Sequence, residues 1–114
     1  MVIVTGQIHA RLDTVDELRR LSLEHVARSR AEPGCLEHGV SIDVNDGLRL
    51  VFFERWSDRA ALDTHFSVPA SRAFADQAAR LAAQAQVAGD VLRSGADPGA
   101  KSAGSQRRRI SLAS

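Results

Sequence analysis

The side chains best suited to acid–base chemistry and to binding an aromatic molecule gather between Phe52 and Ser67, in the stretch FFERWSDRAALDTHFS. This stretch holds the only tryptophan, Trp56, and three of the four phenylalanines, together with Glu54 and His65. An imidazole exchanges protons near pH 7 and is the commonest general acid or base. An indole ring can form the wall of an apolar pocket. These residue types predict a site that binds a flat molecule and moves a proton.

Each of these side chains also has a purely structural interpretation. Trp56 could pack in the core with its N–H bonded to a carbonyl oxygen. His65, at the end of a short helix, could complement the helix dipole. Glu54 could have a raised pKa and act as a base, or it could pair with an arginine and hold the dimer or the helix in place, and we favour the second role. Phe52 and Phe53 are expected mainly in the core.

No metal, cofactor or nucleophile motif accompanies this stretch. His9 and His38 lie in predicted strands without ligands at metal-binding spacing, and no H-x-H or H-E-x-x-H pattern occurs, so no metal site is expected. No residue pattern suits a flavin or a haem, so no cofactor is expected. Cys35 is the only cysteine, which excludes an intramolecular disulfide, suits a reducing compartment and predicts a buried, inert thiol.

The composition fits one small domain that binds neither nucleic acid nor membranes. The chain has 114 residues and a formal net charge of +1, which gives no general attraction to polyanions. It lacks a basic leader and a long apolar run, so a cytoplasmic location is expected. After Leu92 the sequence becomes small and polar, which predicts a folded domain over 1–94 and a disordered tail over 95–114. The tail sequence RRRISL is typical of a basophilic kinase site at Ser111 or of a solvated basic tail.

The spacing of apolar residues predicts the element order β-α-β-β-α-α-β. Strands are predicted at 2–10, 35–44, 48–56 and 86–92, and helices at 13–31, from Ser57 or Asp58 to about His65, and from Pro69 or Ser71 to about Gln84. Thr14 and Glu17 would form a capping box, and NDG at 45–47 would close a hairpin. This order predicts an α+β fold, with a ferredoxin-like split βαβ antiparallel sheet and helices on one face.

Both faces of the predicted sheet carry apolar side chains. Alternation along 48–56 places Leu50, Phe52 and Trp56 on one face, and Val51 and Phe53 on the other. Helices can cover only one of these faces, so the other needs a different cover. A second copy of the chain is the simplest cover, which predicts a homodimer joined through its sheets.

An ordered series of short motifs resembles the antibiotic biosynthesis monooxygenase superfamily. The series is E-P-G-C at 32–35, E-x-W at Glu54 and Trp56, A-L-x-x-H ending at His65, and an aromatic residue, Phe74, in the next helix. The resemblance spans nearly all of residues 1–94 and implies a dimeric α+β barrel. Members of that superfamily include small oxygenases that oxidise quinols or polyketide phenols with O₂ and no metal or flavin. Others degrade haem or isomerise a sugar phosphate.

Three features depart from the patterns of particular members. Phe52 stands where antibiotic-pathway members tend to carry asparagine. Ala70 stands where quinol-oxidising members often have a second histidine. The helix after His65 lacks the axial histidine of haem-degrading members, so haem degradation is not expected.

The residues and the resemblance together predict a cofactor-independent monooxygenase that oxidises a flat phenolic or quinol substrate with O₂. His65 is expected as the catalytic residue, and the substrate-binding residues are expected to be Trp56, Phe52, Phe74 and Glu54. The expected partners are a small aromatic substrate, O₂ and a second copy of the chain. The alternative is a non-catalytic dimeric module on the same scaffold, which binds a small molecule or serves a stress response.

Overall fold

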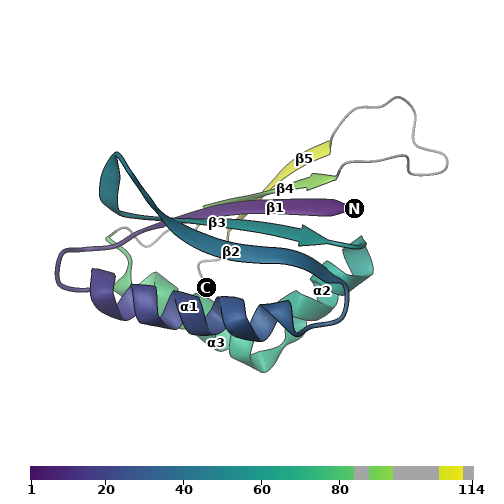
Figure 1. Cartoon of the computed structure of the whole chain (residues 1–114), viewed down its shortest axis with the longest axis horizontal. Helices are drawn as coiled ribbons and strands as arrows, with labels where there is room; N and C mark the ends of the chain where they lie inside the picture. The colour runs from purple at the N-terminus through teal and green to yellow at the C-terminus, as the bar shows by residue number, and fades with distance from the viewer. Residues whose placement is uncertain (84–87, 94–105, 112–114) are drawn as a thin grey trace.

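The computed structural model describes residues 1–83, 88–93 and 106–111. They form β1 (Val2–His9), α1 (Val15–Arg30), β2 (Cys35–Asp43), β3 (Asp46–Trp56), α2 (Arg59–Ser67), α3 (Pro69–Leu81), β4 (Ala88–Arg93) and β5 (Gln106–Ser111). The strands make one antiparallel sheet in the order β2-β3-β1-β4-β5. All three helices lie on the same face of it (Figure 1). The predicted ferredoxin-like α+β fold is confirmed.

The core lies between the sheet and the helices. In the register of the neighbouring strands β1 and β3, Val2 lies opposite Trp56 and Val4 lies opposite Glu54. All four side chains are buried, so this face of β3 is the one that packs against the helices. Because successive strand residues alternate between faces, Glu54 is carried into the core by the same pattern that buries its apolar neighbours.

The start of α1 differs from the prediction. Thr14 makes no side-chain cap hydrogen bond, so the predicted capping box is wrong. Its hydroxyl instead donates to the backbone carbonyl of Leu81 at 2.7 Å and accepts from the amide of Arg11 at 3.0 Å. Glu17 pairs with Arg20 on the exposed side of the helix. The Thr14 hydroxyl therefore ties the start of α1 to the end of α3.

The hairpin and the second helix form close to where the sequence places them. Strands β2 and β3 are joined through Val44 and Asn45, whereas the sequence predicts the turn at 45–47, because Asp43 pairs with Asp46 and β3 begins two residues earlier than expected. The Asp58 carboxylate accepts a hydrogen bond from the amide of Ala61 at 2.8 Å, which confirms the predicted cap of α2. This cap fixes the first turn of the helix that carries His65.

The end of the chain differs from the expected disorder at residues 106–111. These residues form β5, which pairs antiparallel with β4 and places Arg109 opposite Asp90. An edge strand presents unpaired backbone N–H and C=O groups, and β5 satisfies those of β4. Ser111, where the sequence also fits a kinase site, ends this strand. The rest of the predicted tail lies outside the described residues.

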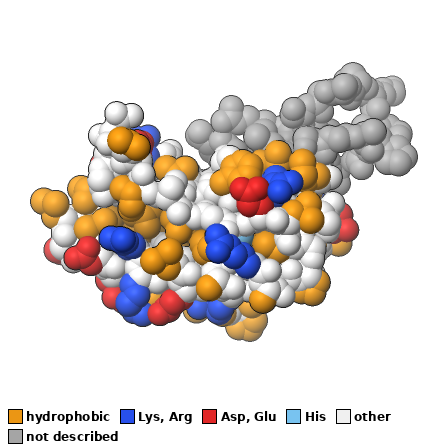
Figure 2. All heavy atoms as spheres, viewed as in Figure 1, with side chains coloured by type: hydrophobic (Ala, Val, Ile, Leu, Met, Phe, Trp, Pro, Cys, Tyr) orange, Lys and Arg blue, Asp and Glu red, His pale blue; other side chains and the backbone are white. Residues whose placement is uncertain are grey.

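The surface carries mixed charge. Figure 2 shows acidic and basic side chains interspersed among hydrophobic ones, and on the described part of this face no broad patch has a single sign. This agrees with the net charge of +1. Within residues 1–83, 88–93 and 106–111, no helix is long and apolar enough to cross a membrane.

Candidate active site

A cavity of about 250 Å³ lies between the sheet and the helices. Strands β1 and β3 and all three helices line it, through Val4, Thr5, Gly6, Gln7, Ile8, His25, Phe52, Glu54, His65, Phe66, Ser71, Arg72, Phe74, Ala75 and Ala78. Most of this lining is apolar. An apolar cavity with a few convergent polar groups is the usual form of a small-molecule site.

Four of the five predicted site residues meet at this cavity. Phe52, Glu54, His65 and Phe74 all line it. The rings of Phe52 and Phe74 lie 6.0 Å apart, centroid to centroid, with an interplanar angle of 62°. The strand alternation and the motif series therefore select four side chains that the fold brings to one cavity.

Trp56, the fifth predicted residue, is not among the lining residues. Its side chain is fully buried, with 0% of the residue exposed. The indole N–H donates to Glu54 Oε1 at 2.9 Å, and the indole centroid lies 4.6 Å from that of His65. The expectation that Trp56 forms a pocket wall is thus corrected, because the ring lies behind two cavity residues and holds them in place.

His65 is held between two carboxylates. Its Nδ1 lies 3.1 Å from both oxygens of Glu32, which follows α1. Its Nε2 lies 3.9 Å from Glu54 Oε1. The Glu32 contact favours a proton on Nδ1, which leaves Nε2 as the acceptor nitrogen. Glu32 was not singled out as a site residue from the sequence, where it figures only in the E-P-G-C motif.

Glu54 is a buried carboxylate with two histidine neighbours. Burial is the largest single influence on its pKa and raises it. The approach of His38, the Trp56 hydrogen bond and the charge of His65 together outweigh burial and lower the pKa of Glu54 below its ordinary value. Glu54 is therefore ionised at neutral pH, which disfavours a base of raised pKa. Its partners among the described residues are Trp56, His38 and His65, and not the arginine that the sequence suggested.

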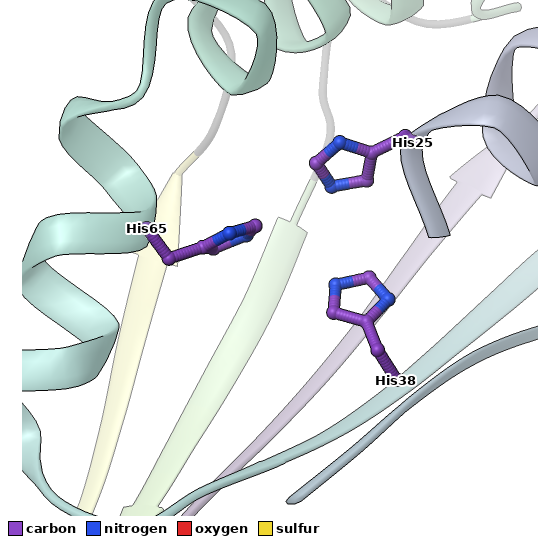
Figure 3. A group of neighbouring side chains, drawn as sticks. All are labelled: His25, His38 and His65. Atoms are coloured by element: carbon purple, nitrogen blue, oxygen red, sulfur yellow. The ribbon is translucent and has the colours of Figure 1, made fainter. Parts of the chain in front are cut away.

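Three histidines from three elements converge beside the cavity (Figure 3). His25 comes from α1, His38 from β2 and His65 from α2, and all three are buried. Their ring centroids are 5.3, 5.4 and 5.6 Å apart, and one ring nitrogen of each lies within 4.8 Å of the others. The expectation of no metal site rested on spacing along the chain, which does not reveal a cluster assembled by the fold.

His25 is neutral at physiological pH. Burial is the main cause, followed by the charges of His38 and His65, and together they lower the pKa of His25 to about 3. Its ring stacks on Phe74, with centroids 4.2 Å apart and an interplanar angle of 7°. Sequence reasoning missed this residue, although it lies four positions after Leu21 on the buried stripe of α1.

Several ring nitrogens of the cluster have no hydrogen-bond partner. His25 Nδ1 and both nitrogens of His38 are buried and unpaired within the described residues. His38 Nε2 lies 3.3 Å from Glu54 Oε1, close enough for an ion pair but without hydrogen-bond geometry. A buried polar group without a partner costs about 1–3 kcal/mol, so this arrangement is maintained against a substantial penalty.

The turn before β2 places Glu32 against α2. Gly34 has a φ of +82°, a conformation that strongly favours glycine. A Cβ atom there would lie 2.5 Å from the Cβ of Ala61 and 2.8 Å from the hydroxyl of Ser57. The amide of Ser57 also donates to the carbonyl of Gly34 at 2.8 Å. Only glycine allows this close approach, which brings Glu32 to His65.

Known proteins are similar to this chain in sequence. Residues 1–77 match the family model described as antibiotic biosynthesis monooxygenase. The uncharacterized protein sll1783 of Synechocystis is 35% identical over 83 residues. That match covers 73% of this chain, which spans only 56% of the length of the relative.

Solved structures extend the similarity to the fold. Rv0793 from Mycobacterium tuberculosis superposes with a TM-score of 0.77 at 31% identity, covering 86% of this chain and 98% of that one. PA3566 from Pseudomonas aeruginosa gives a TM-score of 0.73 at 29% identity, covering 83% of this chain and 94% of that one.

Proposed function

Because this chain belongs to the antibiotic biosynthesis monooxygenase family, we propose that it is a monooxygenase that oxidises a flat phenolic or quinol substrate with O₂. The proposed reaction needs no resident flavin, haem or metal, because the substrate itself supplies the electrons. The observation that carries the proposal is the cavity, whose mostly apolar lining includes His65 and Glu54. An apolar site suits the aromatic ring, and a positioned imidazole suits its hydroxyl.

The aromatic and the polar lining residues have different roles in this proposal. Phe52 and Phe74 would contact the faces or edges of the substrate ring, as aromatic pairs do. His65 Nε2 would take the phenolic proton, with Glu32 holding Nδ1 and stabilising the imidazolium that forms. Glu54 and Trp56 would orient His65 and not act as the base.

With a hydroquinone as substrate, the proposed reaction begins with transfer of a proton and an electron from the substrate. Proton transfer to His65 gives the phenolate, which passes one electron to O₂ and leaves a phenoxyl radical beside superoxide. The two radicals form a C–O bond, and the O–O bond of the resulting peroxide then breaks with loss of water. One hydroquinone and one O₂ thus give one hydroxyquinone and one water. The protein supplies a water-poor cavity, a base and fixed polar groups.

A panel of hydroquinones and polycyclic phenols tests the proposal. With ¹⁸O₂, one labelled oxygen atom should appear in the product, and one O₂ should be consumed for each product formed. Substrate analogues that bind without any O₂ uptake across the whole panel would instead favour the non-catalytic binding module. The assay includes EDTA, so that its result refers to the protein alone.

We also propose that a second copy of the chain covers the outer face of the sheet. All three helices lie on the other face (Figure 1). Phe53 is 39% exposed on the outer face, and Ile3 and Val51 beside it are only partly buried. Pairing of two such faces would remove this apolar surface from water. A cytoplasmic location is likewise proposed, since the single cysteine suits a reducing compartment.

A further inference from the structure

We propose that His25, His38 and His65 form a binding site for one divalent first-row transition metal ion, with Zn²⁺ and Co²⁺ as its simplest probes. Imidazole nitrogen is a preferred ligand of Zn, Cu, Fe and Ni, whereas Mg²⁺ and Ca²⁺ prefer oxygen. Three histidines with a fourth position open to a cavity are the ligand set of several zinc sites. The inference does not depend on the proposed oxygenase activity.

The three rings surround one space. Figure 3 shows them converging from a helix, a strand and a second helix. One ring nitrogen of each lies within 4.8 Å of the other two. In a tetrahedral site with Zn–N bonds of about 2.0–2.1 Å, the nitrogens would be roughly 3.4 Å apart. Each ring would therefore move toward the centre by less than about 1 Å, which side-chain rotation can provide.

The cluster has ring nitrogens available for coordination. His25 Nδ1 and both nitrogens of His38 are buried without a hydrogen-bond partner. Buried polar atoms in folded proteins are nearly always paired, so an unpaired set of this size calls for an explanation. A metal ion would bind one nitrogen of each ring and so give some of these unpaired nitrogens a partner.

His65 already has the second partner that metal-binding histidines usually have. Its Nδ1 lies 3.1 Å from both oxygens of Glu32. A ligating histidine typically donates its other N–H to a carboxylate, which fixes the tautomer and orients the ring. In this arrangement Nε2 is the nitrogen left for the metal.

The charge around the cluster matches a dication. Glu32 and Glu54 place two carboxylates against it, with side chains only 18% and 10% exposed. Glu54 Oε1 lies 3.3 Å from His38 Nε2 and 3.9 Å from His65 Nε2, within reach of a fourth coordination position. The two carboxylates, three neutral imidazoles and a divalent ion would together have a net charge close to zero.

Metal binding and the proposed proton transfer would compete for the same atom. An ion bound to His65 Nε2 prevents that nitrogen from accepting a proton. The metal-loaded protein should therefore lose the oxygenase activity, and EDTA should restore it. Binding itself is measured without any substrate.

The test is titration of the EDTA-stripped, dialysed full chain with Zn²⁺ by calorimetry and with Co²⁺ by visible absorption. Wild-type protein should bind one ion per chain, show the ligand-field bands of nitrogen-ligated, four- or five-coordinate Co²⁺, and unfold at a higher temperature as Zn²⁺ is added. His25→Phe keeps the stack on Phe74 but removes a ligand, and should weaken binding by more than about tenfold. Glu32→Gln should weaken binding by roughly 10–100-fold.

His9→Asn is the matched control, because it removes the one histidine outside the cluster. Its affinity for both ions should equal that of the wild type. Absence of Zn²⁺ heat and of Co²⁺ bands in the wild-type protein would overturn the proposal. Equal loss of binding in His9→Asn and His25→Phe would overturn it too, since it would indicate non-specific binding. Thermal unfolding of each metal-free variant confirms that the protein tested is folded.

Discussion

His65 has a different neighbour on each ring nitrogen, and this asymmetry determines what the imidazole can do. Glu32 contacts Nδ1 at 3.1 Å, and Nε2 faces Glu54 at 3.9 Å. A carboxylate on one nitrogen selects the tautomer in which the other nitrogen accepts a proton. Trp56 holds Glu54 through the indole N–H at 2.9 Å. Glu32, Glu54 and Trp56 thus together orient His65 so that Nε2 is its acceptor nitrogen.

Glu32→Gln tests this tautomer control. An amide can donate to Nδ1 as well as accept from it, so it no longer selects the productive tautomer. We expect turnover to fall by roughly 10²-fold or more while substrate binding changes little. The matched control is Glu37→Gln, which removes a carboxylate that pairs with Arg55 at 2.8 Å on the exposed side of the sheet. Steady-state kinetics in which both variants lose the same activity would contradict the assigned role of Glu32.

His25 makes stability depend on pH. Its folded-state pKa is lowered from 6.5 to about 3, so the unfolded chain binds a proton that the folded chain refuses. The stability that His25 contributes is complete above pH 6.5 and is lost as pH falls toward 3, with a slope of at most about 1.4 kcal/mol per pH unit. Urea unfolding with EDTA at several values between pH 5 and pH 7.5 measures this slope.

His25→Phe provides the comparison, because it keeps the ring stacked on Phe74 and removes the titrating group. The unfolding free energy of this variant should depend less steeply on pH, by up to about 1.4 kcal/mol per pH unit, which corresponds to one proton. An unchanged slope would mean that His25 has the same pKa in the folded and the unfolded chain, which would contradict its lowered folded-state pKa.

The site residues on β3 could be predicted from the sequence, whereas His25, the site residue on α1, could not. Alternation along a strand places Phe52, Glu54 and Trp56 on one face, whatever the rest of the fold. The buried state of Trp56 could not be read from that pattern, because it depends on how α2 packs. His25 occupies a helix position that is normally apolar, and only the tertiary fold brings it to His38 and His65.

At the scale of elements, the turn between α1 and β2 packs against α2 and brings residues of the two segments into contact. Gly34 lets this turn approach the first residues of α2 and so brings Glu32 to His65. The E-P-G-C motif predicted a turn here, but the reason for the glycine is a contact with a helix more than twenty residues later. Contacts of this range cannot be derived from local sequence preferences.

Gly34→Ala should therefore be costly. The positive φ alone costs a residue with a Cβ about 1–2 kcal/mol, and overlap with Ala61 at 2.5 Å adds to this. We expect a loss of more than about 2 kcal/mol in the free energy of unfolding. Gly47→Ala is the control, because a Cβ there meets nothing within 4 Å. Similar stabilities for the two variants by urea unfolding would show that the close packing of this turn is unimportant.

Two element-level predictions failed because tertiary contacts overrode local patterns. Thr14 and Glu17 fit a capping box, yet the Thr14 hydroxyl bonds to the carbonyl of Leu81, which local sequence cannot reveal. Composition predicted no regular structure in 106–111, yet the backbone there pairs with β4. An edge strand can recruit almost any extended segment, since the pairing uses backbone groups.

At the scale of the whole molecule, the helices cover one face of the sheet and leave the other face as the proposed dimer surface (Figure 1). Phe53 lies on that face and is 39% exposed. Light scattering after size exclusion should give the mass of a dimer. Phe53→Asp should shift it to a monomer, because a buried interface does not accept an unpaired charge. Val44→Asp, at a hairpin residue that is 99% exposed, should remain dimeric. A wild-type monomer at micromolar concentration would contradict the proposal.

The most direct test of the proposed oxygenase is O₂ uptake by the wild type and by His65→Ala, in EDTA, with two hydroquinones of different acidity. If His65 Nε2 accepts the phenolic proton, the variant should turn over roughly 10²–10⁴-fold more slowly with both substrates. Thermal unfolding of the variant establishes that the fold persists. Equal O₂ uptake by both proteins, or a rate that follows the acidity of the substrate and ignores the mutation, would contradict the assignment of His65 as the base.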